Sequence, residues 1–237
     1  MLEINIKKSL RNFQLNVELS LDIPEIVVLV GTSGSGKTSL LRGIAGFESV
    51  EGRIRVGDAL WQDDAQGVIL PPHKRRVGYV FQEPFLYPHL SVRENLVMGF
   101  RRVPASQRRF DVNEVVELLD LGALLEGEPE ELSGGERQRI CLGRSLLFSP
   151  DLWLLDEPLN ALDFRAKKRL LPLLKEVLTS DQKPVIYVSH LPEEVVLLAH
   201  RVVEIDNGRI SFSGSLSEAK NSCGLVPMLI DGFGDMS

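Results

Sequence analysis

A glycine-rich segment between an apolar run and a helix-forming run constrains the fold of this chain most. Residues 31–38 read GTSGSGKT; they follow the apolar run IVVLV at 26–30 and precede Ser39-Leu40-Leu41. Glycines let the backbone curl, so that its N–H groups and the N-terminus of the next helix face phosphate oxygens. The sequence therefore predicts a strand, a phosphate-binding loop and a helix in that order.

The side chains of this segment suit a nucleoside triphosphate with Mg²⁺. Lys37 adds a positive point charge, and the hydroxyl of Thr38 can ligate Mg²⁺. The other candidate contacts are Ser33, Gly34, Ser35, Gly36 and Ser39. The alternative is a chance glycine-rich turn, which average residue frequencies predict in about one per cent of chains this long. The strand and the helix on either side favour the phosphate-binding loop.

Short apolar runs alternate with longer helix-like stretches along the chain. We expect strands at 26–30, 77–81, 152–155, 185–189 and 202–205. Continuously apolar strands are typical of a mainly parallel sheet in an α/β fold, where helices cover both faces and ligands gather at the carboxyl ends of the strands. Between residues 91 and 148 only helical patterns are evident, from Ser91, from Asp111 to Leu121 and from Ser133 to Phe148. We interpret this stretch as an inserted helical subdomain.

Two adjacent carboxylates follow one of the predicted strands, in the run LWLLDEP at 152–158. Asp156 is placed to hold Mg²⁺ through water, and Glu157 to orient or deprotonate an attacking water molecule. Alone, such a pair is more often a solvated turn. The phosphate-binding loop earlier in the chain favours the catalytic interpretation.

The run LSGGERQ at 132–138 opens a predicted helix. Ser133 is a candidate N-cap, and Glu136 stands in the reciprocal position of a capping box. Capping does not explain Gly134 and Gly135, which remove side chains where a second helix N-terminus could approach an anion. The chain therefore offers two helix ends that can face phosphate.

Together, these three motifs resemble the Walker and signature motifs of ABC ATPases, and the resemblance covers almost the whole chain. It extends to Gln82 in YVFQE and to His190 in VIYVSH. The resemblance implies that Gln82 contacts Mg²⁺ and the attacking water, and that His190 contacts the γ-phosphate. It also implies that Asp163 in LNALD belongs to a segment crossing to a partner subunit, although Asn160 stands where serine is common.

The resemblance also implies a domain plan for residues 1–237: a single ABC-type P-loop NTPase domain. An antiparallel β subdomain is expected at the N-terminus, the helical subdomain at about 84–150 and a short tail at 218–237. Phe13, near the end of the first hairpin, is the best match for the aromatic ring that stacks on adenine. A core phenylalanine on a strand is the open alternative.

Composition limits the partners. The formal net charge of −6 provides no global basic field for nucleic acid. The longest apolar runs are far shorter than the roughly 18 residues that span a bilayer, so we expect membrane attachment through a partner. Cys141 and Cys223 stand alone, which fits a reducing compartment, and no histidine has ligand spacing with them. The phosphate-binding loop and the resemblance to ABC ATPases imply ATP and Mg²⁺ as the cofactors.

Features outside the shared motifs resemble importer ATPases. These are residues 70–82 and 86–92; more narrowly, residues 1–5, 63–68 and 169–172 resemble the ATP-binding subunit of molybdate importers. The resemblance implies a peripheral protein on the cytoplasmic side of the cell membrane. Its partners would be a second copy of the chain, integral-membrane permease subunits and, indirectly, a solute-binding protein.

Several alternatives stay open at this point. Many molybdate ATPases continue into a C-terminal oxyanion-binding regulatory domain, which does not follow here, so we expect either a natural variant or a truncated form. A thiamine importer ATPase and a soluble non-transport ABC ATPase are the competing functions. A scaffold without turnover is disfavoured because Lys37, Gln82, Asp156, Glu157 and His190 are all present.

Two further predictions concern interfaces. Residues 83–95 are expected to form the docking surface for a cytoplasmic helix of the permease. The working unit is expected to be a head-to-tail homodimer. Each ATP site would then combine the catalytic residues of one chain with Ser133, Gly134 and Gly135 of the other.

Overall fold

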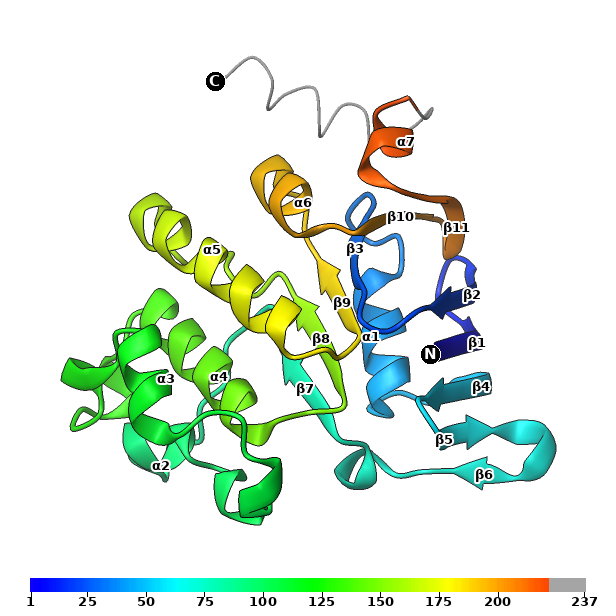
Figure 1. Ribbon diagram of the computed structural model, residues 1–237. Coiled ribbons are helices and arrows are strands. Elements are labelled where there is room, and N and C mark those ends of the chain that lie inside the picture. Colours follow the sequence, from blue (N-terminus) through cyan, green and yellow to red (C-terminus); the bar gives the residue numbers. More distant parts are fainter. Residues whose placement is uncertain (222–237) are drawn as a thin grey trace. The chain divides into compact units, whose positions relative to one another are not determined.

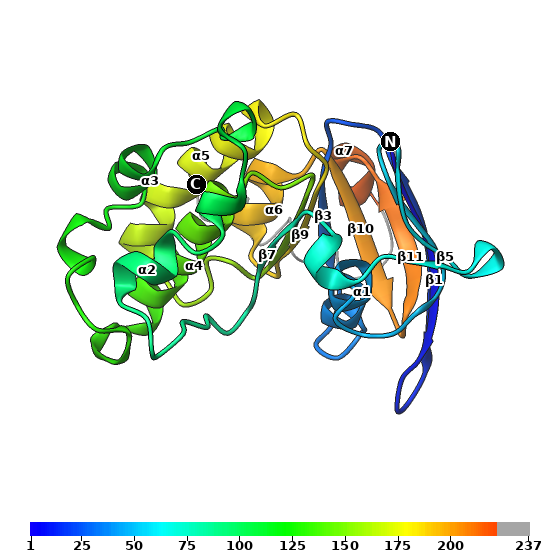
Figure 2. The same cartoon turned by 90° about the horizontal axis from the view of Figure 1, so that it is seen from below.

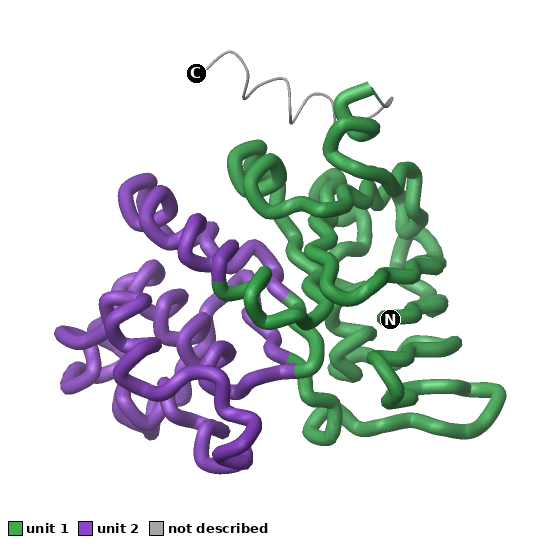
Figure 3. The backbone as a smooth tube through the Cα atoms, viewed as in Figure 1, with its two compact units in different colours: residues 1–77, 151–154, 177–237 green, residues 78–150, 155–176 purple. Residues whose placement is uncertain are grey.

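The computed structural model describes residues 1–221, and the chain divides into two units (Figure 1, Figure 3). Unit 1 comprises residues 1–77, 151–154 and the described residues from 177 onward, and unit 2 comprises 78–150 and 155–176. Cys223 and most of the tail predicted at 218–237 lie outside the described residues.

Unit 1 contains an antiparallel sheet of five strands in the order β2-β1-β4-β5-β6. Its strands are β1 (Leu2–Ser9), β2 (Gln14–Leu21), β4 (Glu51–Val56), β5 (Ala59–Asp63) and β6 (Val68–Ile69). Apolar residues alternate along β1 and β2, so one face of the sheet is buried. In the register, Ile4 lies opposite Leu19 on one side and Ile54 on the other. The predicted N-terminal antiparallel region is confirmed.

The second sheet has six strands in the order β11-β10-β3-β9-β8-β7. They are β3 (Ile26–Val30), β7 (Val77–Val80), β8 (Leu152–Asp156), β9 (Val185–Val188), β10 (Arg201–Asp206) and β11 (Arg209–Gly214). Strand β3 pairs in parallel with β9 and β10, and β11 runs antiparallel to β10. All five predicted strands are present, and β3, β8 and β9 are buried along their whole length. The α/β fold class is confirmed.

The core of unit 1 lies around helix α1 (Lys37–Ala45), which is placed between the two sheets (Figure 2). Its apolar residues, Leu40, Leu41 and Ile44, are fully buried. Helices α6 (Pro192–Leu198) and α7 (Leu216–Lys220) and the 3₁₀ turns η1 (Asp64–Gln66) and η2 (Pro72–Lys74) complete the unit. The loop before α1 is therefore held by packed elements on both sides.

Unit 2 is mainly helical. Its helices are α2 (Val92–Leu96), α3 (Val112–Leu118), α4 (Gly134–Phe148) and most of α5 (Phe164–Ser180), with 3₁₀ turns η3 (Phe100–Arg102), η4 (Ala105–Gln107), η5 (Gly122–Leu124) and η6 (Pro129–Glu131). At Gly143 of α4, an added Cβ would meet Leu96, Val115 and Leu119, so α4 packs closely against α2 and α3. No helix among residues 1–221 is both long and apolar enough to cross a bilayer.

The predicted helix starts are confirmed, because Ser91, Asp111 and Ser133 each form a capping box. One predicted end is wrong: α3 stops at Leu118 instead of continuing to Leu121. The chain reverses at Asp120, which has a φ of 53°. The N–H of Leu121 then reaches back to the carbonyl of Val116 and closes the helix end.

Candidate functional site

The predicted phosphate-binding loop lies in unit 1, between the end of β3 and the start of α1. The Nζ of Lys37 donates hydrogen bonds to the carbonyl oxygens of Gly31, at 2.8 Å, and Thr32, at 2.9 Å. The ammonium group is therefore held across the loop. Ser33 and Gly34 are exposed, and Thr38 and Ser39 occupy the first turn of α1. The positive end of the helix macrodipole thus coincides with the lysine charge.

Phe13 lies beside this loop. It occupies the bend before β2 and is half-buried, so the alternative of a core residue on a strand is wrong. The ring also lies near Gly36, where an added Cβ would stand 3.5 Å from Cε2 of the phenylalanine. The structure therefore places an aromatic ring next to the loop, and its role in stacking stays a prediction.

His190 follows β9 in unit 1, and its side chain is exposed. The residues around it are anchored by Glu194, a carboxylate that is only 2% exposed. The hydroxyls of Ser189, at 2.6 Å, and Tyr187, at 3.0 Å, donate to its Oε2. The N–H of Leu191 in turn donates to Ser189 Oγ at 3.0 Å. The backbone that carries the histidine is thereby fixed on both sides.

The acidic pair lies at the end of β8 in unit 2, where Asp156 is 2% exposed. Glu157 has a φ of 48°, which costs a non-glycine residue about 1–3 kcal/mol and is typical of functional sites. Its Oε2 accepts hydrogen bonds from Gln82 Nε2, at 3.2 Å, and from Asn160 Nδ2, at 3.1 Å. Two amide groups therefore orient the carboxylate that was predicted to act on water.

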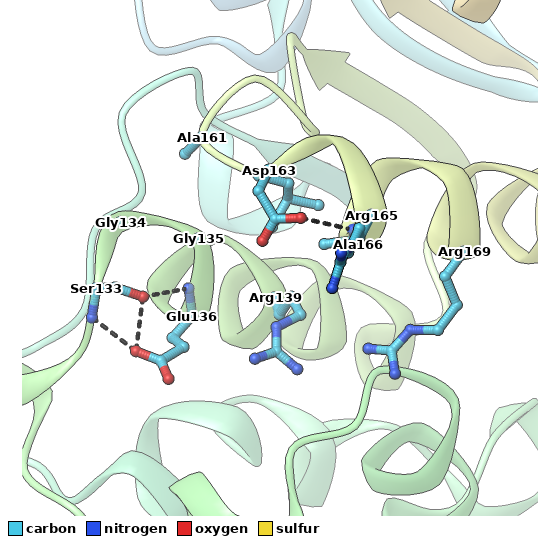
Figure 4. Close-up of a pocket in the computed structure, with 11 residues that line it drawn as sticks. Ser133, Gly134, Gly135, Glu136, Arg139, Ala161, Asp163, Arg165, Ala166 and Arg169 are labelled. Atoms are coloured by element: carbon cyan, nitrogen blue, oxygen red, sulfur yellow. Dashed lines mark hydrogen bonds between the residues drawn. The ribbon is translucent and has the colours of Figure 1, made fainter.

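The LSGGERQ segment lines a cavity of about 590 Å³ that lies within unit 2 (Figure 4). Ser133 caps α4, and its hydroxyl donates to Glu136 Oε2 at 2.6 Å. This hydroxyl, together with the backbone N–H of Ser133, holds the pKa of Glu136 below its usual value. The other lining residues are Gly134, Gly135, Arg139, Ala161, Leu162, Asp163, Arg165, Ala166 and Arg169.

Charges of both signs line the cavity, and its guanidinium groups outnumber the carboxylates of Glu136 and Asp163. Asp120 is paired with Arg139, at 3.7 Å, and with Arg169, at 3.2 Å. Three guanidinium groups line it, from Arg139, Arg165 and Arg169, together with the N-terminal ends of α4 and α5. Asp163 accepts the N–H of Ala166 at 2.9 Å, which is the main cause of its lowered pKa, and so caps α5. One cavity is thus faced by two helix N-termini, as Figure 4 shows.

Each unit brings together part of the predicted site. In unit 1 the phosphate-binding loop lies beside Phe13, and in unit 2 Gln82 bonds to Glu157 while Ser133 and Asp163 line one cavity. Sequence reasoning missed Asn160 and Glu194 as supporting residues. Asn160 was noted only as a departure from serine, and nothing in the pattern PEEVV indicates that one glutamate is buried.

Comparison with known proteins adds independent support. A family model described as ABC transporter matches residues 15–160, more than half of the chain. The Molybdenum import ATP-binding protein ModC 1 of Azotobacter vinelandii is 51% identical over 87% of this chain and 57% of its own length. ModC of Pseudomonas syringae pv. tomato is 47% identical over 92% of this chain and 60% of its own. The chain thus spans about 60% of the length of these relatives.

Solved structures agree on the fold. A dimeric ATP-binding cassette in a post-hydrolysis state with ADP and Pi superposes with a TM-score of 0.75 at 25% identity, covering 91% of this chain and 98% of its own. The ATP-binding subunit of an ABC transporter gives a TM-score of 0.81 at 22% identity, with coverages of 98% and 96%. From the family match and the close relatives together, we conclude that the chain belongs to the ABC transporter family.

Proposed function

We propose that this chain is the ATP-hydrolysing subunit of an ABC importer, and that the imported solute is the oxyanion molybdate or tungstate. The observation that carries the ATPase proposal is the pairing of Gln82 with Glu157 at 3.2 Å, next to a buried Asp156. The names of the relatives support the choice of solute. Co-purification with an integral-membrane protein, and ATPase stimulation by molybdate but not thiamine, would test that choice.

The phosphate-binding loop is proposed to hold the triphosphate. Residues 33–36 and Ser39 would contact its oxygens, Lys37 would supply positive charge, and the ring of Phe13 would stack on adenine. Thr38, Gln82 and Asp156 are proposed to hold Mg²⁺; their hydroxyl, amide and carboxylate oxygens are the hard donors that this ion prefers. Bound Mg²⁺ would neutralise charge on the β- and γ-phosphates.

Hydrolysis needs a water molecule aligned with the γ-phosphate. Glu157 is proposed to accept a proton from that water or to orient it, with its carboxylate held by the amides of Gln82 and Asn160. His190 is proposed to contact the γ-phosphate from the rigid segment that Glu194 anchors. These groups position and polarise, which is most of what phosphoryl transfer requires.

The cavity around Ser133 is proposed to complete the ATP site of a second copy of the chain. Its three arginines and two helix N-termini suit the phosphates of a bound nucleotide. The dimeric cassette among the similar structures supports a homodimer. ATP would then join the two chains, and hydrolysis would release them and let the permease change orientation. In this proposal the working protein would lie at the cytoplasmic face of the membrane.

Removal of Mg²⁺ is expected to abolish ATP hydrolysis. The proposed ligands Thr38 and Asp156 supply no positive charge themselves, so within the loop only Lys37 would offset the negative charge of the triphosphate against the attacking water. Phosphate release by the purified chain should stop in excess EDTA and return when excess Mg²⁺ is added. Equal activity with and without EDTA would contradict the metal roles.

The proposed permease contact, residues 83–95, presents aromatic rings on a braced loop of unit 2. Tyr87 meets Phe85 edge to face at 5.2 Å and His89 at 5.8 Å between ring centroids. Phe85 is 56% exposed. The buried side chain of Asn95 accepts the N–H of Tyr87 at 2.7 Å and donates to the carbonyl of Leu90 at 3.0 Å. An anchored loop with exposed rings suits a partner helix.

Cysteines introduced at Tyr87 and His89 are expected to cross-link to the permease in the assembled transporter, because both side chains lie on this loop. A cysteine at Glu130, which is exposed in unit 2 outside the loop, serves as the matched control and should give no adduct. Mass spectrometry of the cross-linked complex is the measurement. Absence of any adduct from both loop positions in a transport-competent complex would reject the docking surface.

A further inference from the structure

The turn between β10 and β11 touches two parts of the nucleotide site in unit 1. It consists of Asn207 and Gly208, with φ values of 46° and 76°, the positive pair that a two-residue hairpin of type I′ requires. The N–H of Gly208 donates to the carbonyl of Ser35 in the phosphate-binding loop at 2.9 Å. Its own carbonyl accepts the N–H of Asn16 on β2 at 2.8 Å. One residue therefore bridges the loop to β2, whose start adjoins Phe13.

The space beside Gly208 is filled by the Phe13 ring. A Cβ at position 208 would stand 2.7 Å from Cδ2 and 2.8 Å from Cε2 of Phe13, and 2.7 Å from the carbonyl oxygen of Gln14. All three distances are too short for atoms in van der Waals contact, so a side chain there would have to move both the ring and the carbonyl of Gln14. Since the ring also lies near Gly36, it is seated between a glycine of the turn and a glycine of the loop.

The hairpin meets the phosphate-binding loop at a second point. Gly31, which opens the loop with a φ of 147°, approaches the carbonyl oxygen of Ile205 on β10 so closely that a Cβ at position 31 would collide with it. The β10–β11 hairpin therefore contacts the loop at Gly31 and at Ser35. Loop, hairpin and aromatic ring form one packed unit.

We propose that Gly208 is a positioning residue that sets the Phe13 ring against the phosphate-binding loop, and that base recognition by the nucleotide site depends on it. The proposal rests on the proposed function of that loop as an ATP site. The two backbone hydrogen bonds of Gly208 fix the spacing between Ser35 and Asn16. Because Gly208 has no side chain, the Phe13 ring has room beside it. A displaced ring would stack poorly on adenine and leave the phosphate contacts in place.

Binding of Mg-ATP and of inorganic Mg-tripolyphosphate separates these two parts of the site. For Gly208→Ala we expect the ATP affinity to fall on the order of tenfold, the effect of losing one base-stacking contact. The tripolyphosphate affinity should stay unchanged, because that ligand has no base. Phe13→Ala should show the same pattern, and the double variant should lose no more than Phe13→Ala alone. Isothermal titration calorimetry measures the dissociation constants of both ligands for the unchanged chain and for the three variants.

Gly57→Ala is the matched control. Gly57 also has a positive φ, 57°, but nothing lies within 4 Å of its Cβ position. The control also places an alanine at a positive φ and should bind both ligands like the unchanged chain. The inference would be overturned if Gly208→Ala kept the affinity for Mg-ATP of the unchanged chain. It would also be overturned if the affinities for Mg-ATP and Mg-tripolyphosphate fell by the same factor. Failure of the unchanged chain to bind Mg-ATP would instead reject the proposed function.

Thermal unfolding gives a second measurement that does not depend on ligand. Gly208→Ala should lower Tm more than Gly57→Ala does, because only the first forces the ring to move. Adding Phe13→Ala to Gly208→Ala should recover part of the difference in Tm between Gly208→Ala and Gly57→Ala. If Gly208→Ala alone does not fold, the added Phe13→Ala should restore folding. If the loss of Tm in the double variant equals the sum of the losses in Gly208→Ala and Phe13→Ala, the two residues do not interact, and the proposed contact is contradicted.

Discussion

Glu157→Gln is expected to bind Mg-ATP as the unchanged chain does and to hydrolyse it at least about 100-fold more slowly, the usual contribution of a general base. The amide oxygen can still accept the hydrogen bonds that Gln82 and Asn160 donate to the carboxylate. The geometry at the end of β8 is therefore kept, and only the charge and the proton acceptor are lost. An ATP-bound dimer should accumulate.

Steady-state phosphate release and size-exclusion chromatography with Mg-ATP measure the two effects. Glu130→Gln makes the same chemical change at an exposed position of unit 2 and should leave both unchanged. Unchanged turnover in Glu157→Gln, or loss of ATP binding itself, would reject the role given to this carboxylate.

Mixing two inactive variants is expected to restore hydrolysis. Lys37→Ala removes the ammonium from the phosphate-binding loop, and Ser133→Arg removes the cap of α4 and fills its cavity. In a composite site the mixed dimer keeps one intact pair: Lys37 of the Ser133→Arg chain and Ser133 of the Lys37→Ala chain. If each chain used its own two helix ends, no mixture could contain an intact site.

The control mixes Lys37→Ala chains with chains that carry both substitutions, since no intact site can then form in either arrangement. Hydrolysis should return only in the first mixture if one site turns over alone. If both sites of the dimer must be intact for turnover, neither mixture hydrolyses ATP. The structure of an ATP-bound dimer then shows whether the site is composite. Phosphate contacts from Lys37 and Ser133 of a single chain in that dimer would refute the composite site.

Features with a local physical cause could be predicted from the sequence. The five strands predicted at 26–30, 77–81, 152–155, 185–189 and 202–205 followed from short apolar runs. The helix start at Ser133 followed from a capping box that spans four residues, and the starts at Ser91 and Asp111 followed from helical patterns. The phosphate-binding loop followed from glycines between such a strand and a helix. In each case the residues that determine the conformation are neighbours in the chain.

Features that depend on an unusual backbone conformation or on distant residues were out of reach. Glu157 and Asn160 are only three residues apart, but no local pattern requires the φ of 48° that Glu157 adopts where its carboxylate accepts the amide of Asn160. The burial of Glu194 depends on hydroxyls of β9 and its end, and the seat of Phe13 depends on Gly208, almost two hundred residues later in the chain. The sequence identifies the candidate residues, and tertiary packing determines which of them contact one another.

The capping box at Ser133 affects which groups at the N-terminus of α4 can bind phosphate. A serine hydroxyl has a single proton, and here it points to Glu136 Oε2 at 2.6 Å. A phosphate oxygen is also only an acceptor, so phosphate and carboxylate would compete for that proton. Replacing one anionic acceptor by another conserves the number of hydrogen bonds, and the hydroxyl then adds little to the free energy of association. Attraction for phosphate would come from the backbone N–H groups of Gly134 and Gly135 and from Arg139. The serine hydroxyl would determine where a phosphate oxygen binds at the helix end.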